Sequence, residues 1–215
     1  MKVLTLDDME LLIKAMADTA IANERYFSDL DSIVGDADFG VSLADGFRAV
    51  LNQWDTIDRS SISSFLIKVS TIITSNVGGC SGPIWGTGFM RAGMKAKDKT
   101  SITLVDLVAM LRSAIEGIMA RGGAQLGDKT LLDAIAPATD KLEEWSRTKP
   151  DVFINAFQEA SDAANEAIES TKNWIAKRGR QSFAGERSIG SPDPGIVAVA
   201  TMWQALAKVI KETYK

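Results

Sequence analysis

Apolar residues recur every three or four positions along almost the whole chain, which is the spacing of one face of an α-helix. The first such stripe follows Thr5, which can form a capping box with Asp8. Residues 70–77 are rich in β-branched side chains, but the helical spacing continues into them through Ile73 without a turn signal. Pro137 predicts a kink or break in one helix. The predicted helices are residues 6–20, 43–54, 62–73, about 84–97, 104–118, 130–146, 150–177 and 194–213. The sequence therefore predicts an all-α fold of about eight helices.

Four glycine-bearing segments separate these helices, at residues 31–40, 78–88, 122–130 and 179–195. In an antiparallel array of helices, alternate connections emerge at the same end, so loops that are distant in sequence can meet. We find no linker, low-complexity tract or internal repeat, and we expect residues 1–215 to form a single domain.

Composition excludes several classes of function. The chain has 215 residues, no histidine and one cysteine, which removes Ser-His-Asp and Cys-His catalysis, histidine-ligated zinc and an internal disulfide. The net charge of -4, with scattered lysines and arginines, disfavours nucleic acid and anionic membranes as partners. The longest charge-free apolar stretch, residues 195–207, is too short to span a bilayer. We expect a cytoplasmic protein, because nothing in the sequence indicates export.

Three carboxylates lie close together in the first glycine-bearing segment, at Asp31, Asp36 and Asp38. Carboxylates that repel one another are relieved by a hard divalent cation such as Mg²⁺, which also takes phosphate oxygens and water. An Asp/Gly-rich turn with solvated charges explains the segment equally well. An EF-hand is excluded, because counting from Asp31 the sixth loop position is Asp36 where glycine is needed.

The second segment contains the sequence GGCSGP from Gly78, between two helical stripes. Exposed amides at a helix N-terminus, with the Ser81 hydroxyl beside them, can hold an anion. A plain turn between helices is an equal alternative, and Cys80 on its own is typical of a small buried apolar residue.

The third and fourth segments differ in character. Residues 122–130 nearly match a phosphate-binding Walker A loop, but Asp128 precedes the lysine and no strand precedes the loop, so we interpret it as a flexible glycine loop. Residues 177–195 begin with basic side chains, and Arg180 could stabilise charge on a metal-bound phosphate. Lys177 and Arg178 could equally interact with the C-terminal dipole of the preceding helix.

Four ordered motifs carry a resemblance to a known family: GDADFG from Gly35, GGCSGPIWGTGF from Gly78, GDKTLLDAIAPA from Gly127 and GRQSFAGERSIGSPDPG from Gly179. Across essentially its whole length the chain resembles the nucleotide-binding L subunit of dihydroxyacetone kinases, a domain also found at the C-terminus of single-chain glycerone kinases. The resemblance implies a closed barrel of eight up-and-down antiparallel helices. It places ADP or ATP and two Mg²⁺ ions at one end of that barrel.

The resemblance also implies roles for individual residues. Asp31, Asp36 and Asp38 match the three metal-binding positions. The positions that match the nucleotide-lining residues are Phe39, Gly40, Val41, Ser42, Cys80, Ser81, Gly122, Leu131, Arg180, Asp193, Pro194 and Gly195. The chain departs from the family pattern where Ala37, Phe39 and Ser42 replace a glycine, a histidine and an asparagine. These departures alter the face toward the sugar-bearing partner and leave the metal-binding carboxylates in place.

The function implied is that of a phosphoryl-transfer subunit. In the family a separate K subunit holds the triose covalently on a histidine, and the L subunit supplies the γ-phosphoryl group. Arg180 and the three carboxylates would then be the catalytic groups of this chain. The alternative is a regulatory protein that contacts a transcription factor and signals through its nucleotide state. The sequence is compatible with free exchange of ATP and with rephosphorylation of bound ADP by a phosphohistidine-carrying phosphotransferase subunit. It is also compatible with either dihydroxyacetone or erythrulose as the ketose.

Overall fold

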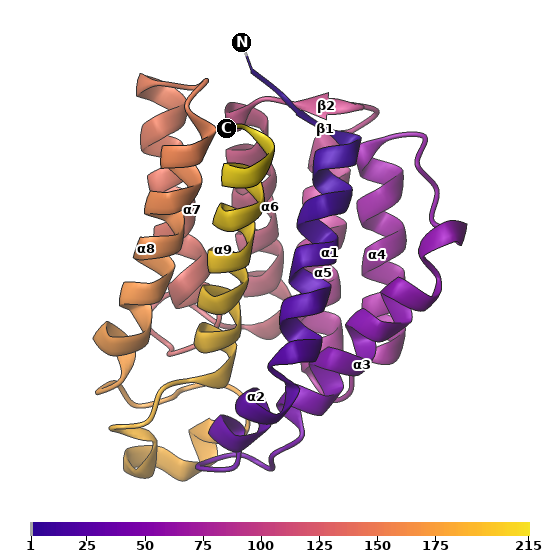
Figure 1. Ribbon diagram of the computed structural model, residues 1–215. Coiled ribbons are helices and arrows are strands. Elements are labelled where there is room, and N and C mark those ends of the chain that lie inside the picture. Colours follow the sequence, from indigo (N-terminus) through magenta and orange to yellow (C-terminus); the bar gives the residue numbers. More distant parts are fainter. Residues whose placement is uncertain (1) are drawn as a thin grey trace.

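The computed structural model describes residues 2–215, which are predominantly helical (Figure 1). The helices are α1 (Leu6–Ala22), α2 (Glu24–Asp31), α3 (Phe39–Asn52), α4 (Ile62–Asn76), α5 (Ser81–Ala96), α6 (Leu104–Gly122), α7 (Leu132–Thr148), α8 (Phe153–Thr171) and α9 (Pro194–Thr213). Two 3-10 segments, η1 (Trp54–Thr56) and η2 (Arg180–Ser188), lie in connections. The two-residue strands β1 (Leu4–Thr5) and β2 (Ser101–Ile102) pair in antiparallel orientation. The all-α prediction is confirmed.

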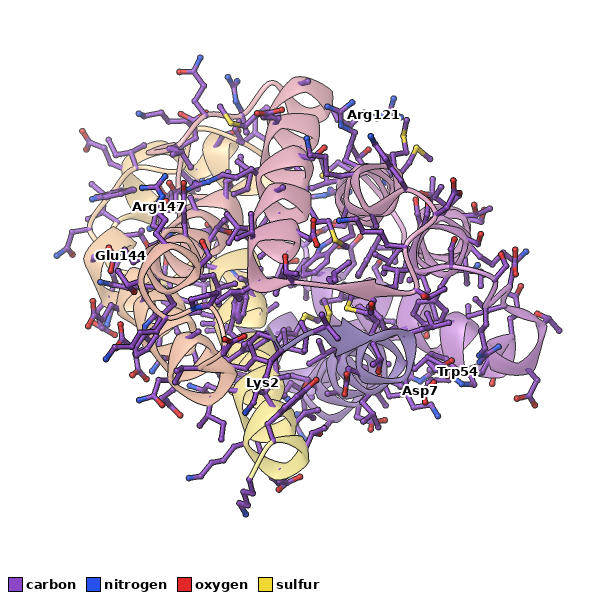
Figure 2. All side chains as sticks on the ribbon, turned by 90° about the horizontal axis from the view of Figure 1, so that it is seen from above. Lys2, Asp7, Trp54, Arg121, Glu144 and Arg147 are labelled. Atoms are coloured by element: carbon purple, nitrogen blue, oxygen red, sulfur yellow. The ribbon has the colours of Figure 1, made fainter. Side chains whose placement is uncertain are left out.

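The long helices pack in a cyclic order. Helix α1 packs against α3, each helix from α3 to α8 packs against the next one, and α9 packs against α1. Viewed from the end that carries the strands, the labelled side chains of Arg121, Glu144 and Arg147 project outward from the helices (Figure 2). The interior is apolar, and its largest fully buried side chains include Phe27, Phe47, Phe65, Phe153 and Phe157. The helices thus contact one another in a ring, and the closed up-and-down barrel that the resemblance implies stays a prediction.

Capping residues fix where two of the long helices begin. The predicted box at α1 is confirmed: the Thr5 amide donates to Asp8 Oδ2 at 2.7 Å, and the Asp8 amide donates to Thr5 Oγ1 at 3.2 Å. Thr103 and Asp106 form the same arrangement at the start of α6. Each box satisfies two backbone groups that would otherwise lack a helical partner.

Several predicted boundaries are wrong, and packing explains why. Helix α7 continues through Pro137, so the predicted break is wrong, and Ala134 and Ala138 on either side are completely buried. Helix α8 ends at Thr171 instead of residue 177. Helix α3 begins at Phe39, four residues before its predicted stripe, and the short helix α2 was not predicted. Only two residues of α2 are buried, which is too short a stripe to recognise.

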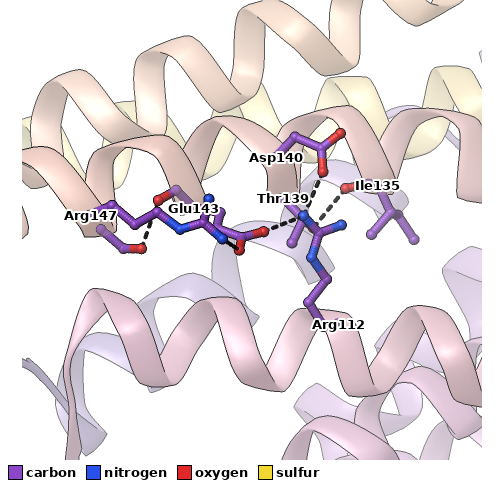
Figure 3. Close-up of polar contacts among 7 residues, drawn as sticks. Arg112, Ile135, Thr139, Asp140, Glu143 and Arg147 are labelled. Atoms are coloured by element: carbon purple, nitrogen blue, oxygen red, sulfur yellow. Dashed lines mark hydrogen bonds and ion pairs between the residues drawn. The ribbon is translucent and has the colours of Figure 1, made fainter.

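An ion network on the outer surface joins α6 to α7 (Figure 3). Arg112 Nη2 lies 2.6 Å from Asp140 Oδ1 and also contacts Glu143, which in turn pairs with Arg147. The hydrogen bond from Arg112 lowers the pKa of Glu143. Because these groups are partly exposed, water screens them and they contribute little to stability. Apolar packing therefore holds these helices together.

The connections that follow α2, α4, α6 and α8 gather at one end of the molecule, opposite the N-terminus. In Figure 1 the loop after α2 and the η2 segment lie together at the bottom of the view. Each glycine-bearing segment includes residues of one of these connections. Across residues 2–215, no helix combines the length and the apolar character needed to cross a membrane.

Candidate functional site

A cavity of about 660 Å³ opens at the end where the glycine-bearing segments meet. All four segments contribute to its wall, together with the first turns of α5 and α9. Its volume lies in the range of small-molecule and cofactor sites. The expectation that loops distant in sequence converge on one end is therefore confirmed.

The acidic wall of the cavity comes from the loop after α2. Asp31 is the last residue of α2 and is buried, whereas Asp36 and Asp38 are more exposed. One carboxylate oxygen from each of the three lies within 4.8 Å of the others. A Cβ atom at Gly35 would lie 2.1 Å from Asp31 Oδ1, so the loop can fold back over Asp31 only with glycine there.

The three carboxylates disfavour one another's charge. Burial raises the pKa of Asp31, and the charge of Asp36 adds to that effect. Burial also raises the pKa of Asp38, with further contributions from Asp36 and Asp31, while Arg180 acts in the opposite direction. Three hard oxygen donors at this spacing fit a Mg²⁺ ion, which would relieve the repulsion.

Arg180 reaches the acidic wall from the other side of the cavity mouth. It begins η2, directly after Gly179, whose φ of 65° lies in the left-handed region. Its Nε lies 2.9 Å from Asp36 Oδ2, and 64% of its side chain is exposed. A guanidinium and the acidic cluster thus share one edge of the cavity, where a phosphate group would meet both.

Backbone amides at the start of α5 form another part of the wall. Gly78, Gly79, Cys80 and Ser81 line the cavity, and Gly79 has a φ of 60°. The turn is tight, because a Cβ at Gly82 would lie 2.3 Å from the Val77 carbonyl oxygen. The helix N-terminus favours an anion here. Cys80 is exposed, so the buried interpretation of this residue is wrong.

Asp193, at the start of α9, lines the cavity and is half-buried. Its Oδ1 accepts a hydrogen bond from the Ile196 amide at 2.8 Å and so caps the helix. Burial raises the pKa of Asp193 to about 7, although the nearby Lys129 ammonium favours the charged form. The carboxyl of Asp193 therefore changes charge near neutral pH.

Most of the predicted site residues reach this cavity, and three do not. Besides Asp31, Asp36 and Asp38, the predicted residues that line it are Phe39, Cys80, Ser81, Gly122, Leu131, Arg180, Asp193, Pro194 and Gly195. Gly40 is buried behind the wall, where a Cβ would lie 2.0 Å from the Glu24 carbonyl oxygen. Val41 and Ser42, on the same first turn of α3, are also absent from the lining.

Sequence reasoning missed several polar residues of the lining, among them Lys129 and Gln181. Gln181 is 5% exposed, and within the described chain its Oε1 has no hydrogen-bond partner. Lys129 lies in the segment interpreted as a flexible glycine loop, which the structure shows to be tightly hydrogen-bonded. Asp133 accepts bonds from the amides of Gly127 and Thr130 at 2.6 and 2.8 Å. The available signal was a lysine that directly follows Gly127 and Asp128 in a glycine-bearing segment.

Comparison with curated proteins gives relatives that match nearly end to end. The chain is 38% identical over 188 residues to the PEP-dependent dihydroxyacetone kinase, ADP-binding subunit DhaL, of Escherichia coli, covering 87% of this chain and 89% of that one. It is 32% identical over 191 residues to the PTS-dependent dihydroxyacetone kinase, ADP-binding subunit DhaL, of Lactococcus lactis, with coverages of 87% and 89%.

Comparison with solved structures and with protein families agrees on the fold. The native dihydroxyacetone kinase of C. freundii superposes with a TM-score of 0.73 at 25% identity, covering 92% of this chain. The present chain spans only 33% of that longer protein. The DAK2 domain family matches residues 33–208, a range that contains all four motifs and most of the cavity. The chain belongs to the DAK2 domain family.

Proposed function

We propose that this chain is the nucleotide-binding, phosphoryl-transferring subunit of a dihydroxyacetone-type kinase. The observation that carries the proposal is one cavity edge where Asp31, Asp36 and Asp38 face Arg180. The relatives described as ADP-binding subunits of dihydroxyacetone kinases support the assignment. The cavity volume of about 660 Å³ also suits a nucleotide.

Each wall of the cavity has a proposed role. Asp31, Asp36 and Asp38 would hold Mg²⁺, which neutralises charge on phosphate oxygens when it is bound. The amides before α5 and the Ser81 hydroxyl orient the phosphates. The Arg180 guanidinium stabilises the charge that develops on the transferring group. The rest of the nucleotide lies along the wall that includes Leu131 and the start of α9.

The acceptor is proposed to be a hydroxyl group of a short ketose held by a separate subunit. The bond from the γ-phosphorus to the bridging oxygen of ATP breaks, and a bond from phosphorus to the ketose oxygen forms. ADP remains with this chain, and the hydroxyl proton passes to a base outside it. Positioning and electrostatics suffice for this transfer, so no covalent nucleophile is required on this chain.

Two sources of the phosphoryl group fit this site. The nucleotide can exchange with free ATP, or bound ADP can be rephosphorylated in place by a phosphohistidine-carrying phosphotransferase subunit. The PEP-dependent and PTS-dependent relatives favour the second source. Mass spectrometry of the nucleotide that accompanies the purified protein tests this point: retained ADP supports the second source, and an empty site supports the first.

A reconstitution experiment tests the proposed function. The protein is mixed with Mg²⁺, ATP and a K subunit loaded with dihydroxyacetone, and dihydroxyacetone phosphate is measured. We expect product only when both subunits are present, and erythrulose is run in parallel to define the ketose. Binding of Mg²⁺ and nucleotide without transfer to either ketose would contradict the kinase assignment.

A further inference from the structure

Lys129 is a buried ammonium whose hydrogen-bonding capacity is used entirely within the chain. It is one of the lining residues of the candidate cavity, and it is 1% exposed. Nζ donates to the carbonyl oxygens of Lys172 and Trp174 at 3.0 Å each, and to that of Ser188 at 2.7 Å. An ammonium has three N–H donors, so none remains for a ligand. Burying such a group is costly unless its bonds are all made.

The three carbonyl groups belong to the two ends of one segment, residues 172–188. Lys172 follows the last residue of α8, and Ser188 is the last residue of η2. The Gly190 amide also donates to the Lys172 carbonyl at 2.9 Å, and the Ala176 amide donates to Ser188 Oγ at 3.0 Å. Lys129 therefore closes the base of a loop that has Arg180 near its middle.

The turn that carries Lys129 is itself held in an uncommon conformation. Lys129 has a φ of 61°, a region that residues other than glycine seldom adopt. Asp133 and Asp128 fix this turn, because Asp128 Oδ2 accepts from the Gln125 amide at 2.9 Å. Strain of this kind persists only when the surroundings enforce it, and it is concentrated at functional sites.

The same turn also contacts the segment just before Arg180. The Lys177 amide donates to the Asp128 carbonyl oxygen at 3.0 Å, and Arg178 Nε lies 3.2 Å from Asp128 Oδ2. A continuous set of contacts thus leads from Lys129 through residues 172–178 to Arg180, and from Arg180 to Asp36.

We propose that Lys129 is a positioning residue for Arg180. Its ammonium fixes both ends of the 172–188 loop and so sets where the Arg180 guanidinium lies relative to the acidic wall. It does not bind phosphate directly, because its three donors are already engaged. The kinetic test of this proposal rests on the proposed function, whereas its hydrogen-exchange test depends only on the contacts of Lys129.

The kinetic test is a double-mutant cycle. Lys129→Met keeps the length of the side chain and removes the ammonium. With the sugar-loaded partner, we expect turnover to fall about 100-fold, the size of effect that misplacement of a catalytic group can produce. We expect nucleotide affinity to change less than about threefold. In an Arg180→Lys background the same substitution should have little further effect, because residues that act as a unit are not additive. An equal loss in both backgrounds would overturn the proposal, as would wild-type turnover.

A matched control is Lys172→Met. It removes a lysine ammonium from the same region but keeps the backbone carbonyl that Lys129 uses. Within residues 2–215 the Lys172 side chain pairs only with Glu169, at 3.5 Å. We expect wild-type turnover. A loss equal to that of Lys129→Met would show a general effect of charge and would overturn the specific role.

Hydrogen exchange tests the tether without requiring activity. In Lys129→Met the amides of Ala176, Lys177 and Gly190 should exchange at least tenfold faster than in the wild type, while amides in α1 are unchanged. Unchanged exchange at all three would overturn the tether. Lys129→Gln, which keeps two N–H donors, should give an intermediate rate. If neither variant keeps wild-type helical circular dichroism, Lys129 supports the whole fold and the positioning role is wrong.

Absence of phosphoryl transfer by the wild type would reject the proposed function and leave the hydrogen-exchange test intact.

Discussion

Arg180 Nε lies 2.9 Å from Asp36 Oδ2, so the guanidinium of one glycine-bearing loop pairs with a carboxylate of another across the mouth of the cavity. The pair joins the basic and acidic walls of the site. Because Asp36 is also one of the three clustered carboxylates, it links Arg180 to the proposed cation site.

Replacing Asp36 by asparagine should weaken Mg²⁺-dependent nucleotide binding and nearly abolish phosphoryl transfer. The variant removes one of the three negative charges that would attract Mg²⁺, and it also removes the charged partner of Arg180. Loss of outer-shell partners alone costs metal sites about 10–100-fold, so a direct ligand should cost at least that much. Calorimetric titration with Mg²⁺ and ADP measures the effect, and circular dichroism checks that the helices persist. Undiminished binding would reject Asp36 as a ligand.

Replacing Arg180 by lysine should reduce turnover far more than nucleotide affinity. Lysine keeps a positive charge but lacks the planar, multidentate guanidinium. An arginine on a transferring phosphoryl group contributes about a thousandfold or more to turnover. Steady-state kinetics with the sugar-loaded partner separate kcat from nucleotide binding. Wild-type turnover would leave the three carboxylates as the only catalytic groups of this chain.

Removing metal and nucleotide should destabilise the protein. A ligand at a hundred times its dissociation constant adds about 2.7 kcal/mol to the free energy of unfolding. For a chain of this size that corresponds to a melting temperature higher by about 5–10 °C. Scanning calorimetry before and after chelation and verified nucleotide removal measures the difference. Asp36→Asn serves as the control and should show a much smaller difference; identical melting curves for the wild type would argue against a bound complex.

Asp193 should make stability depend on pH near neutrality. Its folded-state pKa of about 7 lies above the ordinary value of 3.8, so the folded state binds its proton more tightly than the unfolded state does. The contribution of this carboxyl to the free energy of unfolding is fully present below about pH 4 and is lost as the pH rises to 7. The slope is at most about 1.4 kcal/mol per pH unit. Asp193→Asn keeps a capping oxygen and stays neutral. In nucleotide-free protein its stability relative to wild type should therefore increase from pH 5 to pH 8.

Denaturant unfolding at several pH values measures that dependence. The other acidic groups of the site are present in both proteins, so their titration cancels in the comparison. Parallel plots of unfolding free energy against pH for Asp193→Asn and the wild type would show that burial does not raise the pKa of Asp193.

The long helices could be predicted because each buries a regular apolar stripe. The stripes at residues 62–73 and 104–118 lie within α4 and α6, and the capping box at Thr5 marks the start of α1. Helix α2 escaped detection because it buries little beyond Phe27 and Asp31. The end of α8 was also missed, because it depends on carbonyl groups that a lysine from another loop holds.

The acidic cluster could be predicted because its three carboxylates are close in sequence as well as in space. The role of Lys129 could not be predicted in this way. Its hydrogen-bond acceptors lie 43, 45 and 59 residues away, and each is a backbone carbonyl that carries no sequence signal. Similarly, the pairing of Arg180 with Asp36 joins two loops whose relative position only the packed helices define.

A single-turnover experiment tests whether this chain transfers the γ-phosphoryl group to the ketose on the K subunit. The protein is loaded with Mg²⁺ and ATP labelled in the γ-phosphate, freed of excess nucleotide, and mixed with a K subunit carrying dihydroxyacetone. Labelled products are then separated over time. We expect label to pass from the nucleotide to the ketose, with ADP left on this chain, and we expect Arg180→Lys to slow this step. Label that remains on the nucleotide, or that appears only as inorganic phosphate in the presence of the loaded K subunit, would contradict this expectation.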